Sequence, residues 1–197
     1  MELFYDVETT GFISGKKSYD DLTQAWAIQC AAILSNKDSI IDSMDVIIKP
    51  NGRTEMNPYA EKVHGISLER AEKEGIPEEE ALKLFAQLQV KSDKKICHNA
   101  SFDSKYLYQM MQRNMDVLTD VERSSFYLED NHFCTMKNVK IIKFCNLKNK
   151  TGRPKWPKLS ELYNKLFDKE FENAHNALAD VKALRDCYYE LIAREII

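Results

Sequence analysis

The sequence lacks the features that mark disulfide-stapled, zinc-stapled, exported and membrane-spanning proteins. Its five cysteines are widely spaced and form no C-x-x-C pair, which argues against a disulfide framework or a structural zinc site. The first residues, Met1 to Phe4, show neither the basic stretch nor the apolar core of a signal peptide. The most apolar stretch, residues 25–34, is far shorter than the ~20 residues of a membrane helix. We therefore expect a cytoplasmic protein with reduced thiols and no membrane contact.

The composition is that of an ordinary globular domain. The chain has 197 residues, of which 44% are hydrophobic and 30% charged, and its formal net charge is −3. A chain of this length buries roughly 70% of its unfolded surface, so it needs no covalent staple. No shift in composition indicates a boundary, and we predict a single domain over residues 1–197.

Acidic residues are missing from one long window, residues 131–160. The window holds eight basic residues: Lys137, Lys140, Lys143, Lys148, Lys150, Arg153, Lys155 and Lys158. It carries +8, so the rest of the chain carries −11. The overall charge of −3 disfavours a nucleic-acid partner, but the window does not. The segment 137–158 is either a solvated lysine-rich face or a phosphate-binding one.

Hydrophobic periodicity predicts an α/β protein. Strands are expected over residues 2–7, 25–34, 40–48, 94–97 and 133–136. Helices are expected over residues 57–63, 67–75, 77–89, 100–115, 141–144, 159–166 and 177–192. Strands come first and helices later with a strand between them, which favours a mixed sheet flanked by helices.

Two acidic residues stand two positions apart in the first predicted strand, Asp6 and Glu8. Side chains at this spacing point to the same face of a strand. Two carboxylates beside an apolar core repel each other unless a cation neutralises them. Mg²⁺ and Mn²⁺ prefer carboxylate oxygens, so the pair indicates a metal site. The alternative is a pair of solvated acids at the end of the strand.

A short motif, H-N-A-x-x-D, occurs twice, at His98–Asp103 and at His175–Asp180. In both copies the Asn stands where a helix N-cap is expected, with the Asp one turn inside the helix. Positions five apart lie about 140° around a helix, so each histidine is expected before the cap, facing a site at the helix start. Either copy alone is also compatible with a capping motif and a structural histidine.

Together these motifs supply four carboxylates and a histidine, the set that two-metal phosphodiester hydrolysis requires. Two divalent ions activate a water and stabilise the leaving oxygen, and a nearby histidine accepts the proton of the water. The spacing alone does not distinguish His98 from His175 as that base.

These residues resemble the three motifs of the DEDDh family of 3′–5′ exonucleases, which includes the epsilon proofreading subunit of bacterial DNA polymerase III. The matching segments are Tyr5–Gly11, His98–Asp103 and His175–Asp180, in the family's order, with Val63–Ile66 resembling its His-Gly-Ile element. The resemblance implies a ribonuclease H-like fold with a five-stranded mixed sheet flanked by helices.

The resemblance also implies roles for individual residues. Asp6, Glu8, Asp103 and Asp180 would hold two divalent cations, Mg²⁺ or Mn²⁺, with Asp6 between them, and His175 would be the base.

The pocket for the terminal nucleotide would be lined by Thr9, Thr10, His64 and Phe102, although Phe102 is equally compatible with a place in the helix core. His98 would be a packing or hydrogen-bonding residue.

We therefore predict a metal-dependent 3′–5′ exonuclease that acts on single-stranded or frayed DNA ends and releases nucleoside 5′-monophosphates. An exoribonuclease or oligoribonuclease that acts on RNA ends is the alternative, because the same motifs serve both. A non-catalytic binding module would have lost part of the catalytic set, which is complete here. A DNA polymerase is a candidate partner. Within the lysine-rich window, Trp156 would either stack on a base or, as we favour, anchor the next helix.

Overall fold

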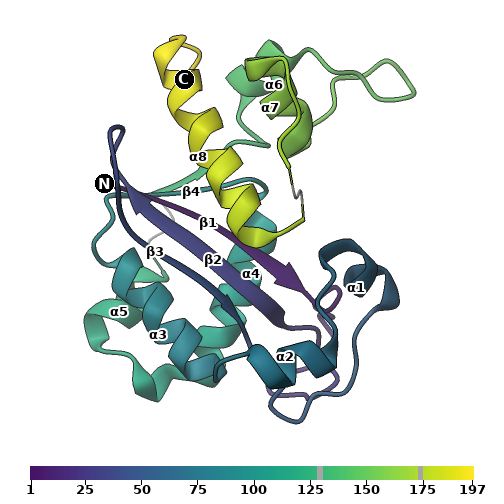
Figure 1. Cartoon of the computed structure of the whole chain (residues 1–197), viewed down its shortest axis with the longest axis vertical. Coiled ribbons are helices and arrows are strands. Elements are labelled where there is room, and N and C mark those ends of the chain that lie inside the picture. The colour runs from purple at the N-terminus through teal and green to yellow at the C-terminus, as the bar shows by residue number, and fades with distance from the viewer. Residues whose placement is uncertain (128–130, 173–174) are drawn as a thin grey trace.

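The computed structural model describes residues 1–127, 131–172 and 175–197 and contains one five-stranded sheet with helices on both faces (Figure 1). The strands are β1 (Glu2–Thr9), β2 (Ala27–Ser35), β3 (Ile40–Ile47), β4 (Lys94–Cys97) and β5 (His132–Cys134). Their order across the sheet is β3-β2-β1-β4-β5. β1 pairs antiparallel with β2 and parallel with β4, so the sheet is mixed and the predicted fold class is confirmed.

Helices account for most of the remaining described chain. They are α1 (Pro58–His64), α2 (Leu68–Glu74), α3 (Glu78–Gln89), α4 (Ala100–Arg113), the 3₁₀ turn η1 (Met115–Val117), α5 (Asp120–Ser125), α6 (Val139–Cys145), α7 (Leu159–Phe167) and α8 (Ala177–Ala193). In the part of the chain that the structure describes, no helix is long and apolar enough to cross a bilayer.

The alternation of β1 separates two cores. Leu3, Tyr5 and Val7 belong to the larger cluster, which includes side chains of α3 and α4. Phe4 points to the opposite face and packs with residues of α8, such as Val181. Figure 1 shows α8 crossing that face, with its first turn near the carboxyl end of β1. Every even-numbered side chain of β1 is therefore directed toward α8.

β4 is much shorter than β1, and this exposes one edge of the central strand. The parallel ladder between them joins only Glu2–Phe4 to Lys94–Ile96. Beyond it, no described residue pairs as a strand with β1 on the β4 side, and the chain after β4 turns into α4. The carboxyl half of β1 is thus open to the first turn of α4.

Three details differ from the predicted elements. The short helix α5 was missed, and the last strand lies at His132–Cys134 rather than at residues 133–136. The prediction that Trp156 anchors α7 is wrong: its side chain is 57% exposed, and the neighbouring Pro157 is the buried residue.

Candidate active site

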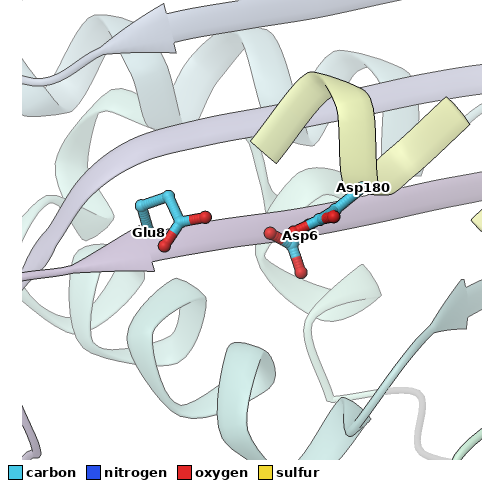
Figure 2. Close-up of side chains that lie close together, drawn as sticks. All are labelled: Asp6, Glu8 and Asp180. Carbon is cyan, nitrogen blue, oxygen red and sulfur yellow. The ribbon is translucent and has the colours of Figure 1, made fainter. Parts of the chain in front are cut away.

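Asp6, Glu8 and Asp180 converge at the carboxyl end of β1 (Figure 2). The period of the strand places Asp6 and Glu8 on the α8 face, two positions beyond the buried Phe4. Asp180 comes from the first turn of α8. One oxygen of each carboxylate lies within 4.8 Å of the others. The structure therefore brings together two residues that are adjacent in sequence and a third that is more than 170 positions away.

The start of α8 is shaped by its capping residues. Asn176 accepts a hydrogen bond from the backbone N–H of Ala179 at 3.2 Å, as an N-cap does. The backbone N–H of His175 donates to Oδ2 of Asp180 at 3.2 Å. This bond ties the residue before the cap to the carboxylate inside the first turn, so His175 and Asp180 are held as one unit.

Asp103 occupies the open edge of β1 and is only 2% exposed. Its Oδ1 accepts the backbone N–H of Val7 at 3.1 Å, the group that a longer β4 would have paired. Its Oδ2 accepts the thiol of Cys97 at 3.1 Å. Asp103 thus lies outside the three-oxygen cluster among the described residues, yet its charge acts directly on Asp6.

Burial raises the pKa of all four carboxyl groups, and the charges of neighbouring carboxylates add to this for Asp6, Glu8 and Asp103. Burial, followed by the charges of Asp180 and Asp103, raises the pKa of Glu8 to about 8. Burial raises the pKa of Asp103 to about 7 and that of Asp180 to about 6, and burial followed by Asp103 and Glu8 raises the pKa of Asp6 well above its usual range. Four carboxylates that are costly to ionise together fit a site for divalent cations, which supply the missing positive charge.

The two copies of H-N-A-x-x-D differ in which residue takes the left-handed conformation. In the first copy Asn99 has φ = 78°, and in the second His175 has φ = 71°. A positive φ is costly for residues other than glycine and is found preferentially at functional sites. The shifted turn places the two histidines differently: His98 is part-buried, whereas His175 is exposed beside Asp180.

His98 has both ring nitrogens engaged. Its Nε2 donates to the carbonyl of Pro157 at 3.0 Å, and its Nδ1 is bonded to the hydroxyl of Thr135 at 2.8 Å. Burial lowers its pKa to about 4. A neutral ring with no free nitrogen cannot accept a further proton, so the geometry favours His175 over His98 as a base at this site.

A mainly apolar pocket of about 200 Å³ adjoins the carboxylate cluster. Glu8 and Thr9 form one wall, while His64 from α1 and Phe102 from α4 form others. The Nδ1 of His64 accepts the backbone N–H of Ile66 at 3.1 Å, which leaves the ring proton on Nε2, and burial lowers the pKa of this histidine. Phe102 also packs against the main core, so it combines both roles considered for it.

The structure does not bring Thr10 to this pocket. Its hydroxyl accepts the backbone N–H of Trp26 at 3.1 Å, and it lines a separate hollow on the other side of Gly11. The substrate role of Thr10 stays a prediction.

Two exposed aromatic residues at the pocket were missed by the sequence reasoning. Phe12 is 82% exposed and meets Phe102 edge to face, with ring centres 6.0 Å apart. Tyr59 on α1 is 75% exposed. A signal was present, since large aromatics directly after Gly11 and after the N1 proline of a helix have no apolar pattern to join.

One face of α4 holds the loop between β1 and β2, residues 10–26, which carries Phe12. Three side chains spaced three and four residues apart each donate to a backbone carbonyl of this loop: Tyr106 to Gly11, Gln109 to Ala25 and Arg113 to Tyr19. This spacing places the three donors on one face of the helix. The pocket wall is thus fixed to the same helix that carries Asp103.

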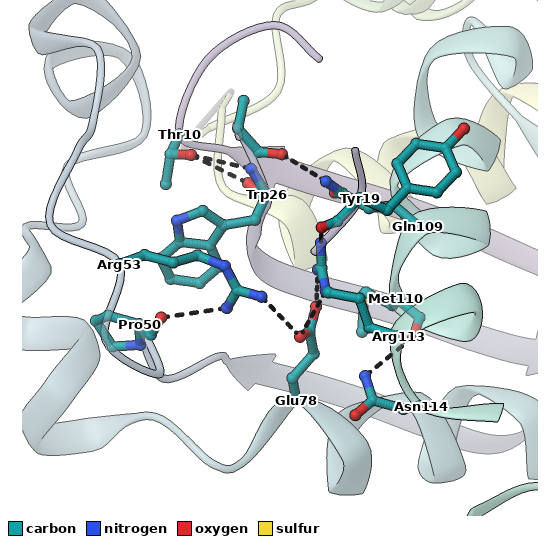
Figure 3. Close-up of polar contacts among 11 residues, drawn as sticks. Thr10, Tyr19, Trp26, Pro50, Arg53, Glu78, Gln109, Met110, Arg113 and Asn114 are labelled. Atoms are coloured by element: carbon teal, nitrogen blue, oxygen red, sulfur yellow. Dashed lines mark hydrogen bonds and ion pairs between the residues drawn. The ribbon is translucent and has the colours of Figure 1, made fainter. Parts of the chain in front are cut away.

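A buried cluster of ion pairs holds α4 against the neighbouring elements (Figure 3). The carboxylate of Glu78 accepts a hydrogen bond from Arg53 at 3.1 Å. It also accepts from two nitrogens of Arg113, from Nε at 3.1 Å and from Nη2. All three side chains are less than a tenth exposed. Arg53 also donates to the carbonyl of Pro50 and lies over the ring of Trp26, 5.3 Å from its centre. The cluster joins the start of α3, the end of α4 and the chain after β3.

Comparisons with known proteins find one matching family model and several solved structures of similar fold. The RNase_T family model, described as an exonuclease, matches residues 3–188. Among solved structures, Escherichia coli Exonuclease I in complex with a dA16 oligonucleotide matches with a TM-score of 0.77 and 22% identity, covering 98% of this chain and 41% of that one. Its complex with a dT13 oligonucleotide matches with a TM-score of 0.76, 22% identity and the same coverage.

Exonuclease I from Methylocaldum szegediense matches with a TM-score of 0.72 and 19% identity, covering 98% of this chain and 40% of that one. The chain thus spans about two-fifths of the length of these proteins, and at such identities the likeness shows the fold. No curated protein matches in sequence.

Proposed function

Because the chain belongs to the RNase_T exonuclease family, we propose that it removes nucleotides from the 3′ end of single-stranded DNA and releases nucleoside 5′-monophosphates. The observation that carries the proposal is the convergence of Asp6, Glu8 and Asp180 beside a pocket with an aromatic rim. A nuclease needs a site that gathers cations at a phosphate and a surface that holds the adjoining nucleoside. We assign these two roles to the carboxylate cluster and to the adjoining pocket, which share Glu8.

The carboxylate cluster would hold two divalent cations, Mg²⁺ or Mn²⁺. Asp6, Glu8 and Asp180 offer converging oxygens, and Asp103 adds a further negative charge that acts on Asp6. When bound, the cations would neutralise the carboxylates and polarise both the water and the scissile phosphate. The buried donors to Asp103 keep its carboxylate fixed, so that its negative charge acts on the site without the side chain swinging into it.

His175 would accept the proton of the attacking water. Its ring is exposed, and its backbone is bonded to Asp180, so the imidazole can reach the water side of the cluster. General bases of this kind contribute about 10²- to 10⁴-fold to a rate.

The terminal nucleoside would enter the pocket between Phe12, Phe102 and Tyr59. Aromatic faces stack on any base, which suits an enzyme that must accept every nucleotide in turn. The Nε2 proton of His64 and the backbone of Thr9 would meet the sugar and phosphate.

DNA is the proposed substrate, and RNA is the alternative. The similar Exonuclease I structures are complexes with the DNA oligonucleotides dA16 and dT13, which supports DNA. Within the family, the motif around His175 favours a place among the DnaQ-like, DEDDh exonucleases related to the epsilon subunit. A polymerase partner and a cytoplasmic location stay predictions.

The test is digestion of matched 5′-labelled DNA and RNA 20-mers with Mn²⁺. We expect a ladder that shortens from the 3′ end, release of mononucleotides with a 5′-phosphate, and faster loss of DNA. Asp6→Ala is expected to abolish the ladder, whereas Lys83→Glu, an exposed charge change on α3, is the matched control. Intact 20-mers with the unaltered protein, or full activity of Asp6→Ala, would contradict the proposal, and faster loss of RNA would favour the alternative substrate.

A further inference from the structure

The segment between β5 and α7 presents an exposed aromatic ring paired with a lysine, which we call the basic ledge: Lys137 and Trp156. Trp156 is 57% exposed, although it is the largest side chain in the lysine-rich window. The ammonium of Lys137 lies over the indole, 5.4 Å from the ring centre. Tryptophan is highly buried on average, so a tryptophan exposed to this extent points to a binding role.

Two contacts fix the basic ledge beside the candidate active site. Lys137 donates to the hydroxyl of Ser101 at 2.5 Å, in the first turn of α4 and two positions before Asp103. On the other side, His98 holds the carbonyl of Pro157, the residue after the indole. His98 therefore acts as a positioning residue that ties the ledge to the end of β4. This gives a role to a part-buried histidine that the proposed chemistry does not use.

Positive charge continues away from the ledge. Six further basic side chains of the window are exposed: Lys140, Lys143, Lys148, Lys150, Arg153 and Lys158. Of the eight basic residues there, only Lys155 has an acidic partner among the described residues, Glu161 at 2.6 Å. Figure 1 shows the stretch between α6 and α7 projecting from the body of the protein, and the bridge between Lys148 and Pro154 closes it into a narrow loop.

We propose that the basic ledge binds the single strand upstream of the scissile bond, with one base stacked on Trp156 and the following phosphates along the lysine-rich loop. This inference rests on the proposed function, because it extends the same strand from the same site. Stacking aromatics combined with a basic track are the usual means of binding single strands without sequence preference. Attraction of an acidic protein partner to the lysines would not account for the exposed indole of Trp156 beside Ser101.

The first experiment uses the fluorescence of the ledge itself. The chain has two tryptophans, and Trp26 is fully buried, so a ligand that reaches the surface reports through Trp156. Oligothymidine of 12 nucleotides is titrated into the protein in EDTA, where hydrolysis cannot occur. We expect oligothymidine to quench the tryptophan emission of the unaltered protein and to cause no quenching in Trp156→Phe. In fluorescence anisotropy, Trp156→Ala is expected to bind about tenfold more weakly, as for loss of one stacked base.

The loop is tested with the triple variant Lys148→Glu, Lys150→Glu and Arg153→Glu. Its salt slope, log Kd against log salt, is expected to fall by about 2, since each lost phosphate contact removes roughly 0.7 for a single strand. Lys83→Glu on α3 is the control with an equally exposed lysine, and it should leave the affinity unchanged.

Activity measurements separate this inference from the proposed function. With Mn²⁺, Trp156→Ala is expected to raise KM for a DNA 20-mer about tenfold while hydrolysis of p-nitrophenyl thymidine 5′-monophosphate stays unchanged. If the unaltered protein cleaves neither substrate, the proposed function fails while the titration in EDTA still decides the ledge. Absence of quenching, or equal affinity of Trp156→Ala and the unaltered protein for oligothymidine, overturns the ledge.

Discussion

Replacing Asp6 by Asn is expected to make the metal-free protein more stable while it removes activity. The carboxylates of Asp6 and Glu8 accept no hydrogen bond from the described residues, and each faces other carboxylates. In the absence of cations the folded state therefore carries repulsion that the unfolded chain does not. An amide of the same shape removes this repulsion and breaks no existing bond.

The size of the effect follows from the geometry. Two unit charges 4.8 Å apart repel by about 3.5 kcal/mol at the effective dielectric of about 20 that suits such sites. Asp6 faces both Glu8 and Asp180 at this range or closer. Because the pKa of Glu8 is about 8, part of the charge is already lost at pH 8. We therefore expect the free energy of unfolding to rise by about 1–3 kcal/mol.

Urea unfolding followed by circular dichroism at pH 8 measures this change, once in EDTA and once with Mn²⁺. The unaltered protein should gain stability from Mn²⁺, and Asp6→Asn should gain little. Asp103→Asn is the matched control: it removes a charge nearby, but it also disturbs the bonds from Val7 and Cys97, so it should gain less or lose stability. Equal or lower stability of Asp6→Asn in EDTA would refute the reasoning.

Three further predictions concern other parts of the molecule. His175→Ala should lower kcat on DNA by about 10²- to 10⁴-fold yet keep the stabilisation by Mn²⁺, whereas a base elsewhere would leave kcat unchanged. Glu78→Gln should lower the free energy of unfolding by about 3–5 kcal/mol in urea titrations, since two buried guanidinium groups lose their partner; a loss under 1 kcal/mol would show that water replaces the carboxylate. The melting temperature of the metal-free protein should rise as the pH falls from 8 to 5. The pKa values of Glu8 and Asp180, about 8 and about 6, lie above their usual 4.5 and 3.8, so the folded state takes up protons first. The destabilisation caused by these ionised carboxylates is therefore complete above pH 8 and vanishes near pH 4. A melting temperature in scanning calorimetry that does not change with pH would contradict this prediction.

The fold was largely predictable because its long elements have clear periods. β1, the neighbouring strands β2 and β3, and the long α8 all lie close to their predicted positions. α5 was missed because six residues are too few to establish a helical period. Its capping box, in which Thr119 and Glu122 bond to each other's backbone, was the available signal. β5 has three residues, so its boundaries depend on pairing with β4 rather than on its own sequence.

Of the predicted site residues, the structure brings together Asp6, Glu8 and Asp180, but their arrangement could not be predicted. Motif spacing cannot show that His98 turns inward and His175 outward, because the difference lies in which residue of each turn takes a positive φ. Nor could it show that the carboxylate of Asp103 is held by Val7 and Cys97. That contact exists only because β4 stops early and leaves the edge of β1 free.

The packing of α8 on β1 has a consequence for the order of folding. β1 and α8 are separated by more than 160 residues of chain, yet α8 covers one face of β1. Contacts so distant in sequence form late in folding. Until α8 docks, Asp6 and Glu8 have neither Asp180 nor His175 beside them. A partly folded chain in which α8 has not docked is therefore expected to lack the proposed activity, which requires the completed core.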